Sequence, residues 1–196
     1  MADYRWMLFV DGENLTIRAQ ELANLKGLLK QGPYFEPDVF VWYPYFSATM
    51  PPFQRRSPQR RQLHGYAIRS YYYTSVVGDD PKLQSIENAL WTIGFTPRVF
   101  KKDARREKTK GVDIALSTDV LTNGFLDNYD IAVLIAGDGD YVPMVREIKR
   151  LGKELYVAFF ESGLSPRLRL ESDQFLDIEP GLQNGWVGYT PGQTIP

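Results

Sequence analysis

The amino-acid sequence predicts an α/β protein with a central, mostly parallel sheet and helices on both faces. The clearest evidence is a run of six apolar residues from Ile131 to Ala136, because strands covered on both faces of a parallel sheet are apolar throughout. Apolar strand-like segments also alternate with segments of helical periodicity along the chain, which is typical of βαβ units with right-handed crossovers. Gly137 and Gly139 then allow a sharp turn where this strand ends.

Breaking and capping residues set the expected elements in the first half of the chain. Gln31-Gly32-Pro33 ends the first helix, and Asp80-Pro81 provides an N-cap and a proline at the first position of the second. Pro51 to Arg61 is expected to form a loop or a short irregular helix. The expected order is a strand at about residues 4–10, a helix at 14–29, strands at 38–46 and 66–73, and a helix at 80–93 that stops at Gly94.

The same alternation continues through the second half. Val112, Leu116 and Val120 recur with helical spacing, so this segment is expected to be a helix that ends near Asn123-Gly124. Ser165-Pro166 has the form of another N-cap and first helical position. The remaining expected elements are strands at about residues 95–100, 130–136, 154–160 and 175–178, with a helix at 141–151 stopped by Gly152.

Length and composition indicate one domain with a short appendage. A chain of 196 residues with 43% hydrophobic content can bury a proper core. We expect the domain to span residues 1–180, followed by an irregular tail at 181–196 that is rich in glycine and contains Pro191 and Pro196.

Composition also excludes several classes of site. The chain has no cysteine and only one histidine, His64, which excludes disulfides, thiolate sites and histidine-rich zinc sites. Oxygen ligands favour Mg²⁺ or Mn²⁺ instead. No leader and no apolar stretch of about 18 residues is evident, so we expect a cytoplasmic protein that does not cross a membrane.

The net charge of -1 gives no global sign of nucleic-acid binding, but the basic residues are unevenly distributed. Two strips stand out. Such strips are more often ordinary solvated surface, but the first contains no acid, which favours contact with a phosphate backbone. The first strip consists of Arg55, Arg56, Arg60, Arg61 and Arg69, and the second of Arg98, Lys101, Lys102, Arg105, Arg106, Lys108 and Lys110.

Acidic residues follow two of the expected strands and begin one expected helix. Asp11 ends the first strand, Asp138 follows the strand at 130–136, and Asp113 lies at the head of a helix. Ligands of open α/β sheets bind at the carboxyl ends of the strands, so these three acids are expected to meet there. Converging carboxylates can hold divalent cations about 4 Å apart that activate water for phosphodiester cleavage. Asp140 either completes this cluster or binds a metal through water.

Simpler interpretations exist for each residue. Asp138 and Asp140 could form a turn and cap the next helix, and Asn14 could cap the first helix, contribute to the site, or both. Lys110 is either a solvated lysine at a helix start or a contact to phosphate. Of the three consecutive tyrosines at 71–73, at least one is expected in the core, while another could stack on a base.

Other enzyme classes fit less well. An aspartate-nucleophile phosphatase would carry its Asp-x-Asp pair on the opening strand, whereas here it comes late. A Toprim-like site built from Glu13 and the Asp-x-Asp pair leaves Asp113 without a role. The dinucleotide fingerprint fails because no third glycine follows at the required spacing.

Three motifs, taken in order, resemble a known family. Phe9-Val-Asp-Gly-Glu-Asn-Leu15, Lys110-Gly-Val-Asp-Ile-Ala-Leu116 and Gly137-Asp-Gly-Asp-Tyr-Val-Pro-Met-Val145 are similar to the motifs of NYN domains in the PIN-like nuclease superfamily, in particular the LabA-like bacterial branch. The tyrosine strand at 71–73 and the segment from Ser165 to Phe175 extend the resemblance to about residues 4–179.

The resemblance implies a PIN-like αβα sandwich and Mg²⁺- or Mn²⁺-dependent cleavage of RNA. The residues that it implies as metal-binding and catalytic are Asp11, Asp113, Asp138 and Asp140. With it, we predict that Asn14, Lys110, Arg55, Arg56, Arg60 and Arg61 bind the substrate, which is expected to be single-stranded RNA. The alternative is a non-catalytic RNA-binding or regulatory protein that keeps the fold. The sequence gives no expectation for the oligomeric state.

Overall fold

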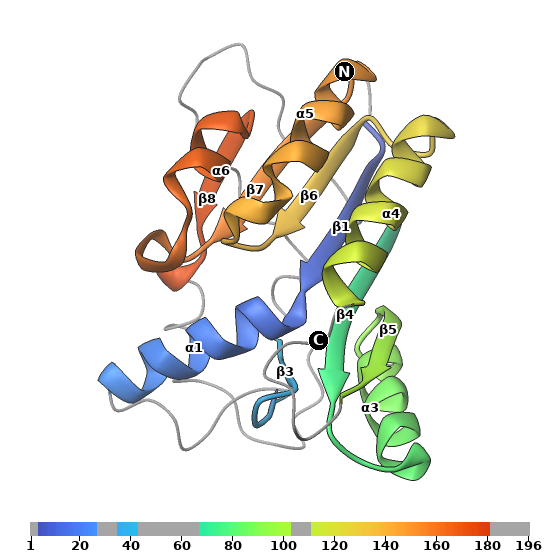
Figure 1. Ribbon diagram of the computed structural model, residues 1–196, viewed down its shortest axis with the longest axis vertical. Helices are drawn as coiled ribbons and strands as arrows, with labels where there is room; N and C mark the ends of the chain where they lie inside the picture. The colour runs from blue at the N-terminus through green and yellow to red at the C-terminus, as the bar shows by residue number, and fades with distance from the viewer. Residues whose placement is uncertain (1–3, 27–34, 43–66, 103–110, 181–196) are drawn as a thin grey trace.

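The computed structural model describes residues 4–26, 35–42, 67–102 and 111–180, and these residues form an α/β fold (Figure 1). The strands are β1 (Trp6–Asp11), β2 (Phe35–Glu36), β3 (Phe40–Val41), β4 (Arg69–Val76), β5 (Thr96–Lys101), β6 (Ile131–Ile135), β7 (Glu154–Phe159) and β8 (Gln174–Asp177). The helices are α1 (Gly12–Lys26), α3 (Asp80–Thr92), α4 (Val112–Phe125), α5 (Val142–Arg150) and α6 (Pro166–Glu171), with short 3-10 turns η1 (Gly139–Tyr141) and η2 (Glu161–Gly163).

The central sheet confirms the predicted fold class. It has six strands in the order β5-β4-β1-β6-β7-β8, and all of its pairings are parallel. The two middle strands, β1 and β6, are buried along their whole length. This burial explains why β6 and residues 6–10 of β1 are apolar throughout, because both faces of each strand are covered.

Helices cover the sheet in layers. α4, α5 and α6 lie next to one another on the face toward the viewer, whereas α3 lies behind β5 (Figure 1). The chain runs outward from β1 to β4 and β5, then returns through α4 to β6 on the other side of β1. With right-handed crossovers, the helices that follow β1 and β6 leave toward opposite faces, so the strand order reverses between these two strands, the position at which ligands of open α/β sheets bind.

The strand expected at residues 38–46 is wrong as a member of the main sheet. Only β3, Phe40–Val41, is a strand within its described part, and it pairs antiparallel with β2 in a separate two-stranded sheet. The physical reason is a turn at Asp38, whose φ of 58° is left-handed, closed by a hydrogen bond of 3.1 Å from the Val39 amide to the Glu36 carbonyl. A residue in this conformation cannot continue an extended strand.

The bounds of β4 and the N-cap of α3 also differ from the expected ones. The strand expected at 66–73 runs from Arg69 to Val76, because Thr74 and Ser75 are buried despite their polarity. Their hydroxyls are satisfied by the Val39 carbonyl and the Glu13 carboxylate. The N-cap of α3 is Asp79 rather than Asp80; its carboxylate accepts the Lys82 amide at 3.1 Å.

The first helix begins earlier than expected, at Gly12, and is described as far as Lys26. Pro51 to Arg61, His64 and the tail at 181–196 lie outside the described residues. Among the helices that the structure describes, none is long and apolar enough to span a membrane.

Candidate active site

Asp11 is fixed at the end of the central strand by the start of the next helix. It is the last residue of β1 and is only 4% exposed, and its Oδ1 accepts the backbone amide of Asn14 at 3.0 Å. Gly12 permits this tight turn, because a Cβ at this position would lie 2.2 Å from the Tyr72 ring and 2.6 Å from the Tyr73 carbonyl oxygen. The chain can therefore enter α1 directly from the strand.

Asp113 meets Asp11 across a shared hydroxyl. The Tyr141 Oη lies 2.8 Å from Asp11 Oδ2 and 3.1 Å from Asp113 Oδ1. Asp113 is exposed in the first turn of α4, so one carboxylate of the pair is buried and the other faces solvent. Carboxylates far apart in the sequence thus converge at the carboxyl edge of the sheet.

Asn14 joins the ends of the two central strands. Its side-chain Oδ1 accepts the backbone amide of Gly137 at 2.8 Å, which connects the start of α1 to the turn after β6. The capping role expected for Asn14 is instead filled by Asp11, whose carboxylate accepts an amide three residues later. Asn14 therefore positions the Gly137 turn relative to Asp11.

Asp138 and Asp140 lie in the turn that Asn14 holds. Asp138 is half-buried and caps η1, since its Oδ1 accepts the Asp140 amide at 3.0 Å, while Asp140 is exposed. Asp138 therefore caps η1 through one of its two carboxylate oxygens, as the capping interpretation expected. The metal-binding roles of Asp138 and Asp140 stay predictions.

The surroundings of Asp11 make its ionised form unfavourable. Burial raises the pKa of Asp11 from 3.8 to about 7, and the negative charges of Asp113 and Glu13 act in the same direction. Hydrogen bonds from the Asn14 amide and the Tyr141 hydroxyl lower this pKa and oppose the shift only in part. An ionised Asp11 is therefore costly unless a positive charge is added nearby.

Sequence reasoning missed Tyr141 and an ion pair beside the acids. Glu13, in the first turn of α1, accepts a hydrogen bond from the Ser75 hydroxyl, and the Lys102 Nζ lies 3.3 Å from the same carboxylate oxygen. The signal for Glu13 was its position two residues after Asp11. Its pairing with Lys102 follows from the neighbouring ends of α1, β4 and β5, which no local pattern reveals.

Basic residues of the second strip are paired where the structure describes them. Arg98 lies 3.2 Å from Asp119, Lys101 lies 3.2 Å from Asp80, and Lys102 pairs with Glu13. Within this part of the chain the strip is interleaved with acids in space. Five predicted substrate contacts, Arg55, Arg56, Arg60, Arg61 and Lys110, lie outside the described residues.

The suggestion that one of the three tyrosines stacks on a base is wrong. Tyr71, Tyr72 and Tyr73 are 4%, 0% and 0% exposed, so none presents a ring face to a ligand. The hydroxyl of Tyr72 donates to the Val41 carbonyl, and that of Tyr73 donates to Asp119. All three rings belong to the core.

The donor set at the sheet edge consists of oxygen atoms, which suits a hard cation. Mg²⁺ commonly takes one or two protein carboxylates and completes its octahedron with water and substrate phosphate, so Asp11 and Asp113 fit such an ion. Among the described residues, no group of three or more His, Cys, Asp or Glu side chains is arranged to hold a metal ion.

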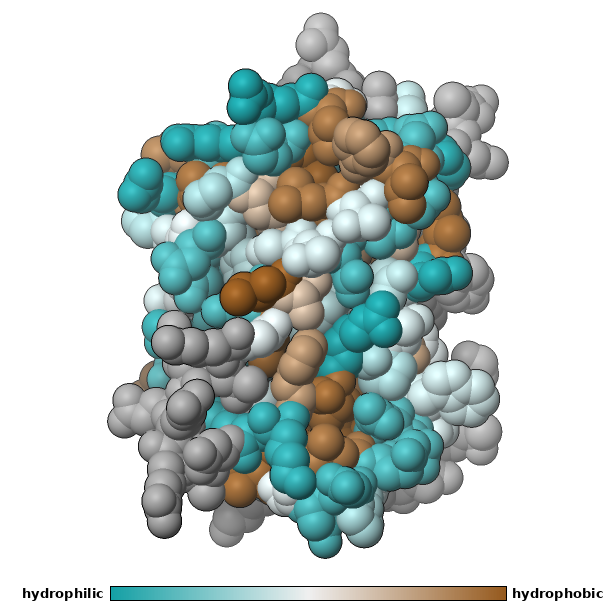
Figure 2. Space-filling view, turned by 45° about the vertical axis from the view of Figure 1, so that its right-hand side comes forward, coloured by the Kyte–Doolittle hydropathy of each residue, from teal (hydrophilic) through white to brown (hydrophobic). Residues whose placement is uncertain are grey.

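An apolar cavity of about 460 Å³ lies at the other end of α4 and does not belong to this site. It is lined by Leu121, Thr122, Phe125, Leu126, Glu147 and Leu151. Figure 2 shows apolar side chains gathered in the upper part of the molecular face that it draws. Asp113 begins α4, whereas the cavity surrounds its last turns, so the acids and the cavity are separated by the length of the helix.

An all-parallel sheet flanked by helices, with acids at its carboxyl edge, has the architecture of the PIN-like class of α/β folds. The chain belongs to the NYN domain family, whose model matches residues 5–179. This membership in the PIN-like nuclease superfamily supports a nuclease or RNA-related role.

Individual relatives are distant in sequence. The Low amplitude and bright protein LabA of Synechococcus elongatus is 22% identical over 183 residues, which cover 89% of this chain and 83% of LabA. Uncharacterized protein MJ0482 of Methanocaldococcus jannaschii is 26% identical over 106 residues, or 54% of this chain and 39% of its own length. The crystal structure of VPA0982, a Vibrio parahaemolyticus protein of unknown function, shares the fold with a TM-score of 0.62 at 17% identity, covering 92% of this chain and 96% of VPA0982.

Proposed function

We propose that this protein is a ribonuclease that cleaves phosphodiester bonds of single-stranded RNA with Mg²⁺ or Mn²⁺. The observation that carries the proposal is the convergence of Asp11 and Asp113 on the Tyr141 hydroxyl at 2.8 and 3.1 Å. Membership in the NYN family supports a nuclease role for such a pair.

Each acidic residue has a distinct part in the proposal. Asp11 and Asp113 hold the cation, and Asp138 and Asp140 add ligands directly or through water. A bound divalent cation lowers the pKa of a water molecule and neutralises charge on the phosphodiester. It also offsets the cost of ionising Asp11, whose pKa is raised by burial to about 7. Asn14 orients the turn that carries Asp138 through its bond to Gly137.

RNA binding is assigned to the remaining predicted residues. We propose that Arg55, Arg56, Arg60, Arg61 and Lys110 contact backbone phosphates. Such contacts make affinity fall steeply with salt, so the slope of RNA affinity against salt concentration reports on them directly.

The decisive experiment compares two aspartates in equivalent positions. Asp113 and Asp80 both lie in the first turn of a helix, but only Asp113 contacts the site. We expect Asp113→Asn to lower the rate of Mn²⁺-dependent cleavage of labelled single-stranded RNA by about 100-fold or more, a loss typical of electrostatic groups at a reacting centre. Asp80→Asn is expected to cleave like the parent protein.

Each possible result has a clear meaning. Equal cleavage by the parent and Asp113→Asn would refute the role of the acidic pair. Cleavage of DNA in preference to RNA would correct the substrate. RNA binding by the parent with no cleavage in Mg²⁺ or Mn²⁺ would favour the alternative, a non-catalytic RNA-binding protein.

A further inference from the structure

The Tyr141 hydroxyl contacts both Asp11 and Asp113. Tyr141 is the last residue of η1, immediately before α5, and is 2% exposed. The ring is therefore held by the core while its hydroxyl reaches the carboxyl edge of the sheet. Burial, followed by the charges of Asp11 and Asp113, raises the pKa of this hydroxyl, so it remains a donor across the physiological range.

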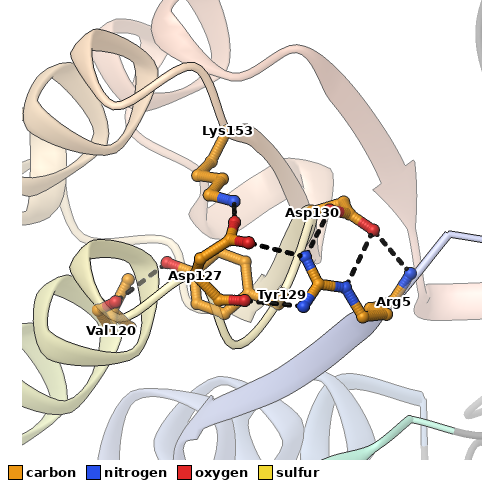
Figure 3. A network of polar contacts seen from close by, with 6 residues as sticks. All are labelled: Arg5, Val120, Asp127, Tyr129, Asp130 and Lys153. Atoms are coloured by element: carbon orange, nitrogen blue, oxygen red, sulfur yellow. Dashed lines mark hydrogen bonds and ion pairs between the residues drawn. The ribbon is translucent and has the colours of Figure 1, made fainter.

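Tyr73 and Tyr156, which are also buried, donate their hydroxyls to carboxylate oxygens of Asp119 and Glu154, whereas two further buried tyrosines use backbone carbonyls. Tyr129 donates to the Val120 carbonyl at 2.8 Å (Figure 3), and Tyr72 donates to the Val41 carbonyl at 3.0 Å. Those bonds satisfy a buried hydroxyl with a neutral backbone group, as packing requires. The Tyr141 hydroxyl instead faces two carboxylates, and it has only one hydrogen to share between them.

Tyr141 also completes the fixation of Asp11. The Asn14 amide holds one carboxylate oxygen of Asp11, and the Tyr141 hydroxyl holds the other. Asp113 differs, because it is exposed and projects from the first turn of a helix. A rigid tyrosine that contacts Asp113 limits the rotamers of its side chain and keeps its carboxylate near that of Asp11.

We propose that Tyr141 is a positioning residue that sets the spacing of the Asp11 and Asp113 carboxylates and thereby the affinity of the site for a divalent cation. This inference rests on the proposed function, since it assumes that the two acids hold the ion. Hydrogen-bond partners behind metal ligands contribute to affinity, and their loss typically weakens binding by about 10- to 100-fold.

The test measures ion binding without RNA. Mn²⁺ is titrated into metal-free protein and free Mn²⁺ is followed by electron paramagnetic resonance. Tyr141→Phe keeps the buried ring and removes only the hydroxyl, and Tyr129→Phe is the matched control, because it removes a buried hydroxyl remote from the acids. We expect Mn²⁺ affinity to fall by about 10-fold or more in Tyr141→Phe and to stay at the parental value in Tyr129→Phe.

A double-variant cycle separates positioning from general loosening of the fold. If Tyr141 acts through Asp113, adding Tyr141→Phe to Asp113→Asn should weaken Mn²⁺ binding less than it does in the parent. Additive effects would overturn the inference. Urea unfolding of every variant identifies the folded fraction, and affinity is expressed per folded molecule.

The outcomes separate this inference from the proposed function. Parental Mn²⁺ affinity in Tyr141→Phe, with RNA cleavage still dependent on Asp113, would overturn the positioning role and leave the nuclease assignment standing. Failure of the parent protein to bind Mn²⁺ or Mg²⁺ at millimolar concentrations would overturn both.

Discussion

At the scale of single residues, the surroundings of Asp11 disfavour its ionised form. Its folded-state pKa of about 7 lies well above the ordinary 3.8, and burial is the main cause. A raised carboxyl pKa means that the folded state favours the protonated form. The stabilising effect is complete below the unfolded pKa and is lost as the pH rises through the folded pKa. The relevant window therefore runs from about pH 4 to about pH 7.

We predict that Asp11→Asn stabilises the cation-free protein at high pH but not at low pH. Asn is neutral throughout, so the variant avoids the cost of ionisation, which a shift of this size limits to about 4 kcal/mol. Urea unfolding in a chelator should show a difference in unfolding free energy that is small at pH 4 and favours the variant by a few kcal/mol at pH 8.

The exposed Asp80 provides the control, because Asp80→Asn removes a charge outside the site. A stability difference between Asp11→Asn and the parent that does not change with pH would show that Asp11 ionises without strain. Saturating Mn²⁺ should raise the unfolding free energy of the parent more than that of Asp11→Asn, because only the parent has the Asp11 carboxylate to bind the ion.

At the scale of elements, the start of α3 is a local feature whose assignment can be tested. The structure assigns the cap to Asp79, which accepts the Lys82 amide at 3.1 Å, and places the neighbouring Asp80 inside the helix. Both residues are acidic and adjacent, so the sequence pattern alone could not distinguish them. Only the capping residue satisfies a backbone amide that the helix leaves free.

We predict that Asp79→Ala lowers the unfolding free energy by about 1 kcal/mol, the usual cost of losing an N-cap. Asp80→Ala should cost only a few tenths of a kcal/mol from the helix dipole. Parallel urea titrations check this prediction. A larger loss of unfolding free energy in Asp80→Ala than in Asp79→Ala would show that Asp80 is the N-cap.

Strand and helix existence was predictable because it depends on local patterns. The run from Ile131 to Ala136 indicated a buried strand, and its position beside β1 follows from parallel α/β packing. In its described part the strand expected at 38–46 forms only β3, outside the main sheet, and its apolar residues gave no sign of the left-handed turn at Asp38. Strand β4 ran longer than expected because Thr74 and Ser75 find partners only in the folded chain.

The candidate site was predictable to a similar depth. Asp11, Asp113 and Asp138 were expected to meet at the carboxyl ends of the strands. The structure joins the first two through Tyr141, and Asp138 caps η1. Tyr141 itself was missed because it continues the apolar spacing of Val142, Val145 and Ile148, so it resembles an ordinary core residue. Its ring does belong to the core, and only tertiary structure reveals where the hydroxyl points.

At the scale of the whole molecule, the two ends of the parallel strands carry different groups of charged residues. The acids occupy the carboxyl edge, while an ionic network ties the opposite edge together (Figure 3). Arg5, just before β1, donates to the Asp127 carbonyl at 2.6 Å and to Asp130 Oδ1 at 2.9 Å, and Lys153 pairs with Asp127. The network connects the start of β1 with the segments that lead into β6 and β7.

This network should make the stability of the folded protein fall at acidic pH. It should have no effect on the proposed RNA cleavage. Hydrogen bonds from Lys153 and Arg5 lower the pKa of Asp127, and hydrogen bonds from Arg5 lower that of Asp130. A lowered carboxyl pKa contributes stability that is present above the ordinary value of about 4 and is lost as the pH falls through the folded value. Asp11 acts in the opposite sense and in a higher window, so the two effects can be separated by pH.

We therefore predict that Arg5→Ala lowers the thermal midpoint at neutral pH and flattens its decline between about pH 5 and pH 3, because fewer carboxylates then gain from ionisation. The matched control is Arg150→Ala, which removes an exposed arginine paired with Glu147 within one helix and should change little. RNA cleavage per folded molecule should equal that of the parent in both variants, since neither residue lies at the acidic edge. A parental acid profile in Arg5→Ala would show that the network does not stabilise the fold. A loss of cleavage without a loss of stability would show that the two edges of the sheet are coupled.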